Sequence, residues 1–221
     1  MSARSSDQFQ PNLSRAALVV VDMQNDFVRA GAPMEVPDAR ATMPIIQKLA
    51  ERFRARHAPV IFTRFVAGPE RTLLWNWSPQ CAPPTCACWR GRRRSYAEVA
   101  GDRLVIDVVD ELPVAANDHV VDKYGYSAFH DTVLPEILKA EGIETLVVTG
   151  TVTQICVEDT VHGAFHSGYP TIVVADAVSS YDRELHAAAL RGIAAKFGWV
   201  TPSSEVLAAL ASPASHHRLT A

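Results

Sequence analysis

Short apolar runs alternate with longer stretches of helical periodicity along most of this 221-residue chain. The runs are rich in β-branched residues and predict buried parallel strands, because a strand covered on both faces carries apolar residues without alternation. The predicted strands cover residues 16–21, 60–65, 119–122, 145–149, 171–175 and 198–200. The region 105–112 predicts a further short strand or a helix turn.

Amphipathic helices are predicted between these strands, where apolar residues recur three and four positions apart. They cover residues 38–57, 131–141, 182–197 and 203–211, with a further helix that follows Gly150 and includes Cys156 in its first turn. Strand and helix alternation is typical of an α/β fold with a parallel sheet and right-handed crossovers. A length of 221 residues with 48% hydrophobic content indicates one domain, residues 1–221.

The amino-acid composition limits the kinds of binding partner that are expected. The net charge is only -3 and no long run has one sign, so neither nucleic acid nor an anionic membrane is expected. The start of the chain lacks the apolar core of a secretion signal and no apolar run reaches membrane-spanning length, which predicts a cytoplasmic protein. The polar ends, residues 1–14 and 212–221, are predicted to be flexible.

Residues 67–102 interrupt the rhythm with tryptophans, a Pro-Pro pair, four arginines between Arg90 and Arg94, and three cysteines. Such a long irregular segment predicts a lid over the functional edge or a contact with another subunit. Cys81, Cys86 and Cys88 do not have a standard zinc spacing, so no metal site is expected, and free thiols are favoured over disulfides. The arginines suit a solvated or interface surface, with carboxylate binding by one of them left open.

Three predicted strands end on residues that can do chemistry. Asp22 and Lys123 end two of them, and Cys156 follows the strand at residues 145–149. Ligands bind at the carboxyl ends of strands in open α/β sheets, and a helix N-terminus lowers the pKa of a thiol placed there. Each residue also has an ordinary interpretation, as a turn cap, a solvated charge and a buried small side chain. The aromatic neighbours of Lys123 would desolvate it, and Asp22 could supply the counter-charge.

Three motifs around these residues resemble the isochorismatase-like cysteine hydrolases, a group that includes nicotinamidases, N-carbamoylsarcosine, ureidoacrylate and biuret amidohydrolases, and isochorismatases. The motifs are VVVDMQNDF, DKYGYSAF and VVTGTVTQICVEDT, and the element order agrees from about residue 16 to residue 210. The resemblance implies a three-layer α/β/α Rossmann-like fold with a mostly parallel central sheet of about six strands.

The resemblance also implies a catalytic triad. Asp22 would take the proton of Cys156, Lys123 would stabilise both groups, and the thiolate would attack an amide-type carbonyl to form a thioester. A cis peptide bond would join Thr151 to Val152, and the backbone amides of Val152 and Cys156 would form an oxyanion hole.

One departure from the family concerns metal. Nicotinamidases carry an Asp-x-His arrangement after the second strand that binds a divalent ion, whereas residues 63–67 here contain no carboxylate or imidazole. No metal or other cofactor is therefore expected. The residues expected to face the substrate are Phe27, Trp75, Trp77, Tyr126, Phe129 and Arg64. Any of the aromatics could instead be core, and Arg64 could form a salt bridge rather than bind a substrate carboxylate.

These observations favour a hydrolase that cleaves the C–N bond of a small amide, carbamoyl or ureido compound. The alternatives are an isochorismatase-type vinyl ether hydrolase, a nicotinamidase, and a non-catalytic or redox-responsive protein that uses Cys81 to Cys88. The resemblance further implies a homodimer or homotetramer.

Overall fold

The computed structural model describes residues 11–211, and its centre is a six-stranded sheet. The strand order is β5-β2-β1-β6-β7-β8, and every neighbouring pair is parallel. The strands are β1 (Ala16–Val21), β2 (Val60–Phe65), β5 (His119–Lys123), β6 (Thr145–Thr151), β7 (Thr171–Ser179) and β8 (Trp199–Thr201).

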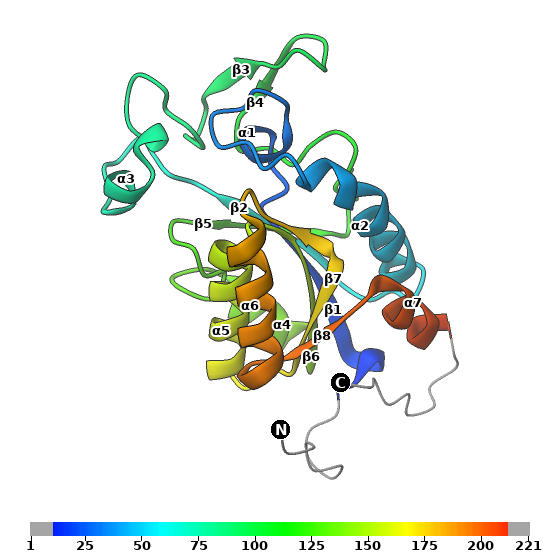
Figure 1. Cartoon of the computed structure of the whole chain (residues 1–221). Helices are drawn as coiled ribbons and strands as arrows, with labels where there is room; N and C mark the ends of the chain where they lie inside the picture. Colours follow the sequence, from blue (N-terminus) through cyan, green and yellow to red (C-terminus); the bar gives the residue numbers. More distant parts are fainter. Residues whose placement is uncertain (1–10, 212–221) are drawn as a thin grey trace.

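Helices cover both faces of this sheet, as Figure 1 shows. On one face lie α2 (Ala39–Arg54) and α7 (Ser203–Ala211). On the other lie α4 (Leu134–Ala140), α5 (Glu158–His166) and α6 (Arg183–Lys196). The predicted three-layer α/β/α fold with a parallel sheet of six strands is confirmed.

Each face of the sheet has its own hydrophobic core because successive strand residues point to opposite sides. Leu18 of β1 belongs to the cluster that includes Phe53 of α2, and its neighbour Val19 belongs to the cluster that includes Leu138 of α4. All six residues of β1 are buried, which explains their unbroken apolar run. The sheet is therefore a rigid, fully covered platform for whatever its strand ends hold.

The predicted strands agree closely with the observed ones, and three of them are longer than expected. β5 ends one residue later, at Lys123, β6 continues from residue 149 to Thr151, and β7 continues from residue 175 to Ser179. The helix predicted over residues 131–141 begins only at Leu134. The expectation for residues 105–112 was wrong: this region consists of turns with one isolated bridge between Gln24 and Val108.

The predicted insertion, residues 67–102, is irregular apart from short elements. It contains α3 (Leu74–Trp77), a 3-10 turn (Pro79–Cys81) and β3 (Arg93–Ser95), which pairs antiparallel with β4 (Asp102–Leu104). β3 and β4 lie at the top of Figure 1, close to the short helix α1 (Asn25–Val28) that follows β1, and α3 lies at the upper left. The insertion thus sits over the carboxyl end of the sheet.

Most of the ends predicted to be flexible lie outside the described residues. Residues 11–14 do not, and here the expectation of a loose arm was wrong. Asn12 donates its backbone N–H to Thr145 Oγ1 at 2.9 Å and its amide to Glu144 at 2.9 Å, so the arm is fastened beside β6.

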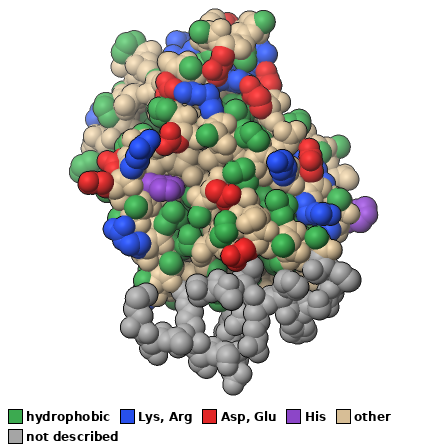
Figure 2. Space-filling view, turned by 45° about the vertical axis from the view of Figure 1, so that its right-hand side comes forward, with side chains coloured by type: hydrophobic (Ala, Val, Ile, Leu, Met, Phe, Trp, Pro, Cys, Tyr) green, Lys and Arg blue, Asp and Glu red, His purple; other side chains and the backbone are tan. Residues whose placement is uncertain are grey.

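Two further observations concern the hydrophobicity of the helices and the distribution of charge on the surface. Within residues 11–211, no helix is both long and apolar enough to cross a bilayer. On the face seen in Figure 2, acidic and basic side chains are interspersed with hydrophobic ones.

Candidate active site

Two of the predicted residues, Asp22 and Lys123, form a fully buried ion pair at the carboxyl end of the sheet. Lys123 Nζ lies 2.8 Å from Asp22 Oδ2, and both side chains are 0% exposed. Strand β2 lies between their strands, and the lysine spans it over the ring of Phe65, at 5.0 Å from the ring centroid. Burial by itself lowers the pKa of Lys123, but the charge of Asp22 and the interaction with Cys156 outweigh it and raise that pKa. The lysine is therefore a fixed cation.

The Asp22 carboxylate is held in place by its surroundings. Thr63 donates its hydroxyl to Asp22 Oδ1 at 2.7 Å and accepts the Asp22 backbone N–H at 3.2 Å. The backbone at Asp22 has a positive φ of 49°, a region that aspartate tolerates better than most residues. At neighbouring Gly150, a Cβ would lie 2.1 Å from the Val21 carbonyl oxygen, so glycine permits close packing of β6 against the end of β1.

Cys156 completes this cluster from the turn that follows β6. It lies in a single π-helical turn, Thr153–Val157, that leads into α5. Its thiol interacts with both the Asp22 carboxylate and the Lys123 ammonium, which act on its pKa in opposite directions. The structure thus brings together all three residues of the implied triad, which the sequence places on three different strand ends.

The expectation of a lowered thiol pKa was wrong for Cys156. Burial is the largest influence and raises the pKa of Cys156; Lys123 lowers it and Asp22 raises it, and the net shift is upward. Cys156 is only 3% exposed, and desolvation destabilises its thiolate form more than a helix N-terminus stabilises it. The resting group is therefore a thiol, and an adjacent base is needed to take its proton.

The turn that holds Cys156 is tied to β7. The hydroxyls of Thr151 and Thr153 both donate to the Ser179 carbonyl oxygen, at 3.2 and 2.9 Å. His186 of α6 places Nδ1 2.9 Å from Thr153 Oγ1, and since that hydroxyl already donates to Ser179, the imidazole is the donor. The peptide bond between Thr151 and Val152 is cis.

A cavity of about 280 Å³ opens beside the thiol. Its wall includes three of the predicted aromatics, Phe27, Trp77 and Tyr126, together with Val152 and Cys156. Trp77 is 77% exposed and comes from α3 of the insertion, so this segment does reach the rim of the cavity. The cavity has the dimensions of a small-molecule site.

Three predicted substrate contacts lie elsewhere. Arg64 is next to Thr63 on β2, and because Thr63 points to Asp22, Arg64 points the opposite way. There it pairs with Asp122 at 2.7 Å and Asp107 at 3.1 Å, which is the salt bridge that the sequence left open.

Trp75 and Phe129 are packing residues. Trp75 stacks on Trp89 with ring centroids 5.7 Å apart and donates its indole N–H to the Ala67 carbonyl oxygen. Phe129 packs against Tyr169 with ring centroids 6.0 Å apart. Neither lines the cavity.

Sequence patterns missed several wall residues. The loop after α1 supplies Met34 and Glu35, and this irregular loop has no periodic signal. Tyr181 also lines the cavity, shortly after the end of β7 at Ser179. The strand-end rule that found Asp22 could have found Tyr181, had the strand not been predicted to end at residue 175.

The cysteines and arginines of the insertion do not line the cavity. Cys81, Cys86 and Cys88 are free buried thiols, and within residues 11–211 no three His, Cys, Asp or Glu side chains are grouped to hold a metal. The solvated-surface expectation agrees with Arg90, which is 50% exposed while it pairs with Asp122, and it was wrong for Arg94, which pairs with buried Asp26.

A family model described as "Isochorismatase domain" matches residues 16–205, which is most of the chain and includes all three buried site residues. The chain belongs to the isochorismatase family. The family resemblance stated by the three motifs is therefore confirmed over the same region.

Relatives within this family carry more specific names. A ureidoacrylate amidohydrolase RutB from Stutzerimonas stutzeri (strain A1501) is 35% identical over 205 residues, which cover 85% of this chain and 79% of that protein. A RutB from Serratia proteamaculans (strain 568) is 35% identical over 217 residues, covering 90% and 84%.

Solved structures of the family superpose well. A cysteine hydrolase from Pseudomonas syringae pv. phaseolicola 1448A gives a TM-score of 0.81 at 28% identity, covering 92% of this chain and 96% of that one. The N-carbamoylsarcosine amidase of Thermoplasma acidophilum gives 0.67 at 30% identity, covering 86% and 96%.

Proposed function

We propose that this protein is a cysteine hydrolase that cleaves the C–N bond of a small amide, carbamoyl or ureido compound. The observation that supports it most strongly is the buried contact of one thiol with both a carboxylate and an ammonium at the wall of a small cavity. The names of the relatives, ureidoacrylate amidohydrolase and N-carbamoylsarcosine amidase, agree with that chemistry.

In the proposed reaction Cys156 is the nucleophile and Asp22 is the base. Cys156 Sγ attacks the carbonyl carbon while its proton passes to Asp22 Oδ2, so that the thiolate forms only as the new bond does. Asp22 then returns the proton to the departing nitrogen, the C–N bond breaks and a thioester remains. A water molecule that gives its proton to Asp22 attacks this thioester, and the released thiolate takes the proton back.

The remaining groups would stabilise charge. Lys123 holds the carboxylate and the developing thiolate at fixed positions through the whole cycle, which its raised pKa favours. We assign the oxyanion hole to the backbone amides of Val152 and Cys156, since both residues line the cavity. One such donor is typically worth ~3 kcal/mol of barrier.

The test is ammonia release from a panel of ureas, carbamoyl compounds and simple amides. We expect turnover by the wild type, unaffected by EDTA, and loss of at least about a thousandfold in kcat for Cys156→Ala, because the nucleophile is gone. Iodoacetamide should label Cys156 faster than Cys81, Cys86 or Cys88, because Cys156 faces the cavity and has a base beside it. Equal labelling, or turnover of no panel member, would count against the proposal.

The competing functions have their own readouts. Pyruvate release from isochorismate that survives Cys156→Ala would indicate the vinyl ether reaction. Zinc or a disulfide in the cluster Cys81 to Cys88, without any turnover, would indicate a binding or redox role.

Three expectations about the whole molecule remain proposals. They are a one-domain organisation over residues 1–221, a cytoplasmic location and a homodimer or homotetramer. The exposed Trp77 and Leu73, 77% and 73% accessible on the insertion, are suited to contact with a second copy. Light scattering coupled to size exclusion would measure the oligomeric state.

A further inference from the structure

The cavity beside Cys156 has an acidic wall. Among the described residues that line it, Glu35 is the only one with a side chain charged at neutral pH. The other wall residues supply aromatic rings, aliphatic groups, hydroxyls and one amide. A charged part of a substrate that reached this wall would therefore meet the Glu35 carboxylate and no cationic side chain among the described lining residues.

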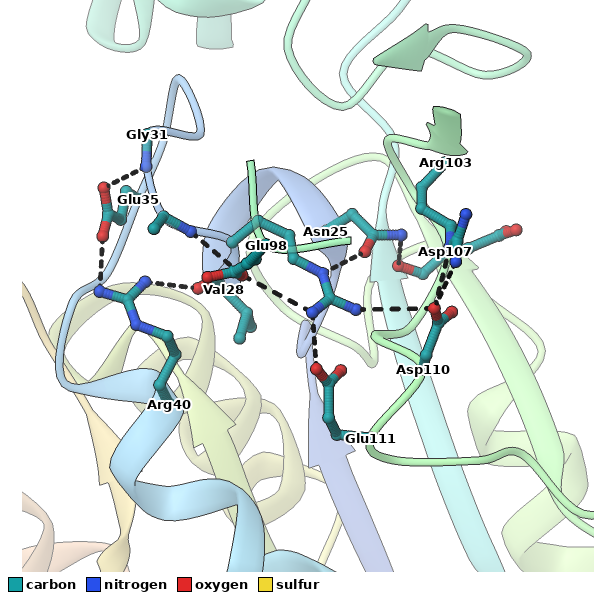
Figure 3. A network of polar contacts seen from close by, with 12 residues as sticks. Asn25, Val28, Gly31, Glu35, Arg40, Glu98, Arg103, Asp107, Asp110 and Glu111 are labelled. Atoms are coloured by element: carbon teal, nitrogen blue, oxygen red, sulfur yellow. Dashed lines mark hydrogen bonds and ion pairs between the residues drawn. The ribbon is translucent and has the colours of Figure 1, made fainter. Parts of the chain in front are cut away.

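Figure 3 shows the Glu35 carboxylate in contact with Gly31 and Arg40. The backbone N–H of Gly31 donates to Oε2 at 2.8 Å, and Arg40 Nη2 donates to Oε1 at 2.7 Å. These contacts, the Gly31 hydrogen bond first, lower the pKa of Glu35. Each carboxylate oxygen keeps lone pairs for a further donor.

No described arginine or lysine lines the cavity itself, and Arg40, the counter-ion of Glu35, lies outside the lining. Arg40 also donates to the Val28 carbonyl oxygen at 2.7 Å, and this second hydrogen bond fixes its guanidinium between Glu35 and Val28. Lys123 is engaged by Asp22 and Cys156, and Arg64 pairs with carboxylates at a separate surface hollow. The cation that would normally hold a substrate carboxylate is missing from this wall.

We propose that Glu35 is a specificity-determining residue that selects substrates without a carboxylate. The substrate class is then a neutral or cationic urea or amide whose N–H groups donate to Glu35. This inference rests on the proposed function and narrows it. It separates the chain from its relatives named for ureidoacrylate, which is an anion, and it also disfavours isochorismate, a dicarboxylate.

The test compares three monosubstituted ureas of similar size and different charge. N-carbamoylglycine is anionic, its N-methylamide is neutral and 2-aminoethylurea is cationic, and each can release ammonia only from the ureido group. We expect kcat/KM for the neutral and cationic ureas to exceed that for the anion by at least about tenfold, with most of the difference in KM.

Two variants of the Glu35 contact move this ratio in opposite directions. Glu35→Gln removes the charge and retains the shape, and should reduce the neutral-to-anion ratio to within about threefold. Arg40→Gln leaves the carboxylate without its counter-ion, and should widen the ratio. The matched control is Glu51→Gln, an exposed glutamate on α2 far from the wall, which should leave the ratio unchanged.

The possible outcomes distinguish a failure of the Glu35 proposal from a failure of the proposed amidohydrolase function. An anion preference in the wild type, or a ratio that neither variant moves, would overturn the role of Glu35 while the amidohydrolase proposal stands. Ammonia release from none of the ureas and none of the wider panel would overturn both.

Discussion

Asp22 and Asp26 lie four positions apart, both are 0% exposed, and their carboxylates have different partners. Asp22 contacts the two other reactive groups of the candidate site, the Lys123 ammonium and the Cys156 thiol. The carboxylate of Asp26 instead accepts hydrogen bonds from the insertion: Oδ2 accepts the Cys88 backbone N–H at 2.9 Å, and Oδ1 accepts Arg94 Nε and the Tyr96 hydroxyl. Burial alone therefore does not identify a catalytic carboxylate.

The partners explain the difference. The donors around Asp26 have nothing to do with a cavity, and together they fasten residues 88–96 over the end of β1. Asp22 has one oxygen held by Thr63, and its other oxygen faces groups that can exchange a proton. A buried carboxylate saturated by fixed donors stabilises structure, whereas one beside a thiol is placed to act as a base.

The largest expected effect is on activity and comes from Asp22→Asn. An amide cannot accept the proton of Cys156, so kcat should fall by about a thousandfold or more while the fold is retained. Initial rates on the best urea or amide, with circular dichroism as a check of folding, measure this. Asp131→Asn, at a side chain 89% exposed, is the matched control and should keep wild-type activity. Asp22→Asn activity within tenfold of the wild type would contradict the assignment.

Asp26→Asn should have its main effect on stability. It leaves the Arg94 charge without its buried partner, which we expect to cost about 3 kcal/mol of unfolding free energy. For a chain of this size that corresponds to a drop in Tm of roughly 6–12 °C. Differential scanning calorimetry measures it. Unchanged stability with a thousandfold loss of kcat would reverse the roles given to the two aspartates.

The smallest effect concerns pH and the thiols beside each aspartate. Burial and then Asp26 raise the pKa of Cys81 to about 11, the same two causes raise the pKa of Cys88 well above its usual value, and burial raises the pKa of Cys156. Unfolded thiols ionise near pH 8.5, so above that pH the unfolded state binds fewer protons and stability falls as pH rises, by about 1.4 kcal/mol per unit for each thiol. Urea unfolding at pH 8, 9 and 10 measures this slope.

Removal of one thiol at a time shows how much the thiol beside each aspartate contributes to the dependence of stability on pH. Cys156→Ala and Cys88→Ala should each reduce the slope between pH 9 and 10 by about one proton equivalent. A slope that stays at the wild-type value in Cys156→Ala would mean that this thiol already ionises in the folded protein. The proton transfer to Asp22 would then be unnecessary.

Much of the site could be predicted because strand ends of a parallel sheet share one edge. The apolar runs located the strands, and Asp22, Lys123 and Cys156 were found by their places after those runs. Arg64 also lies near the carboxyl end of a strand, β2, but it is not in the site. Successive side chains along β2 point to opposite faces of the sheet, and that of Arg64 points away from Asp22. The position of a residue near a strand end predicts which edge of the sheet it lies on. The alternation of side chains along the strand determines which face of the sheet it points to.

The amino-acid sequence by itself determined the order of strands and helices, the layer type and the chemistry available at the sheet edge, because hydrophobic periodicity follows local backbone geometry. Only the tertiary structure decided the partners: that Asp26 holds the insertion, that Glu35 enters the cavity wall and that burial raises the pKa of Cys156. Those facts depend on contacts between irregular segments distant in the chain, and no periodic pattern encodes where such segments meet.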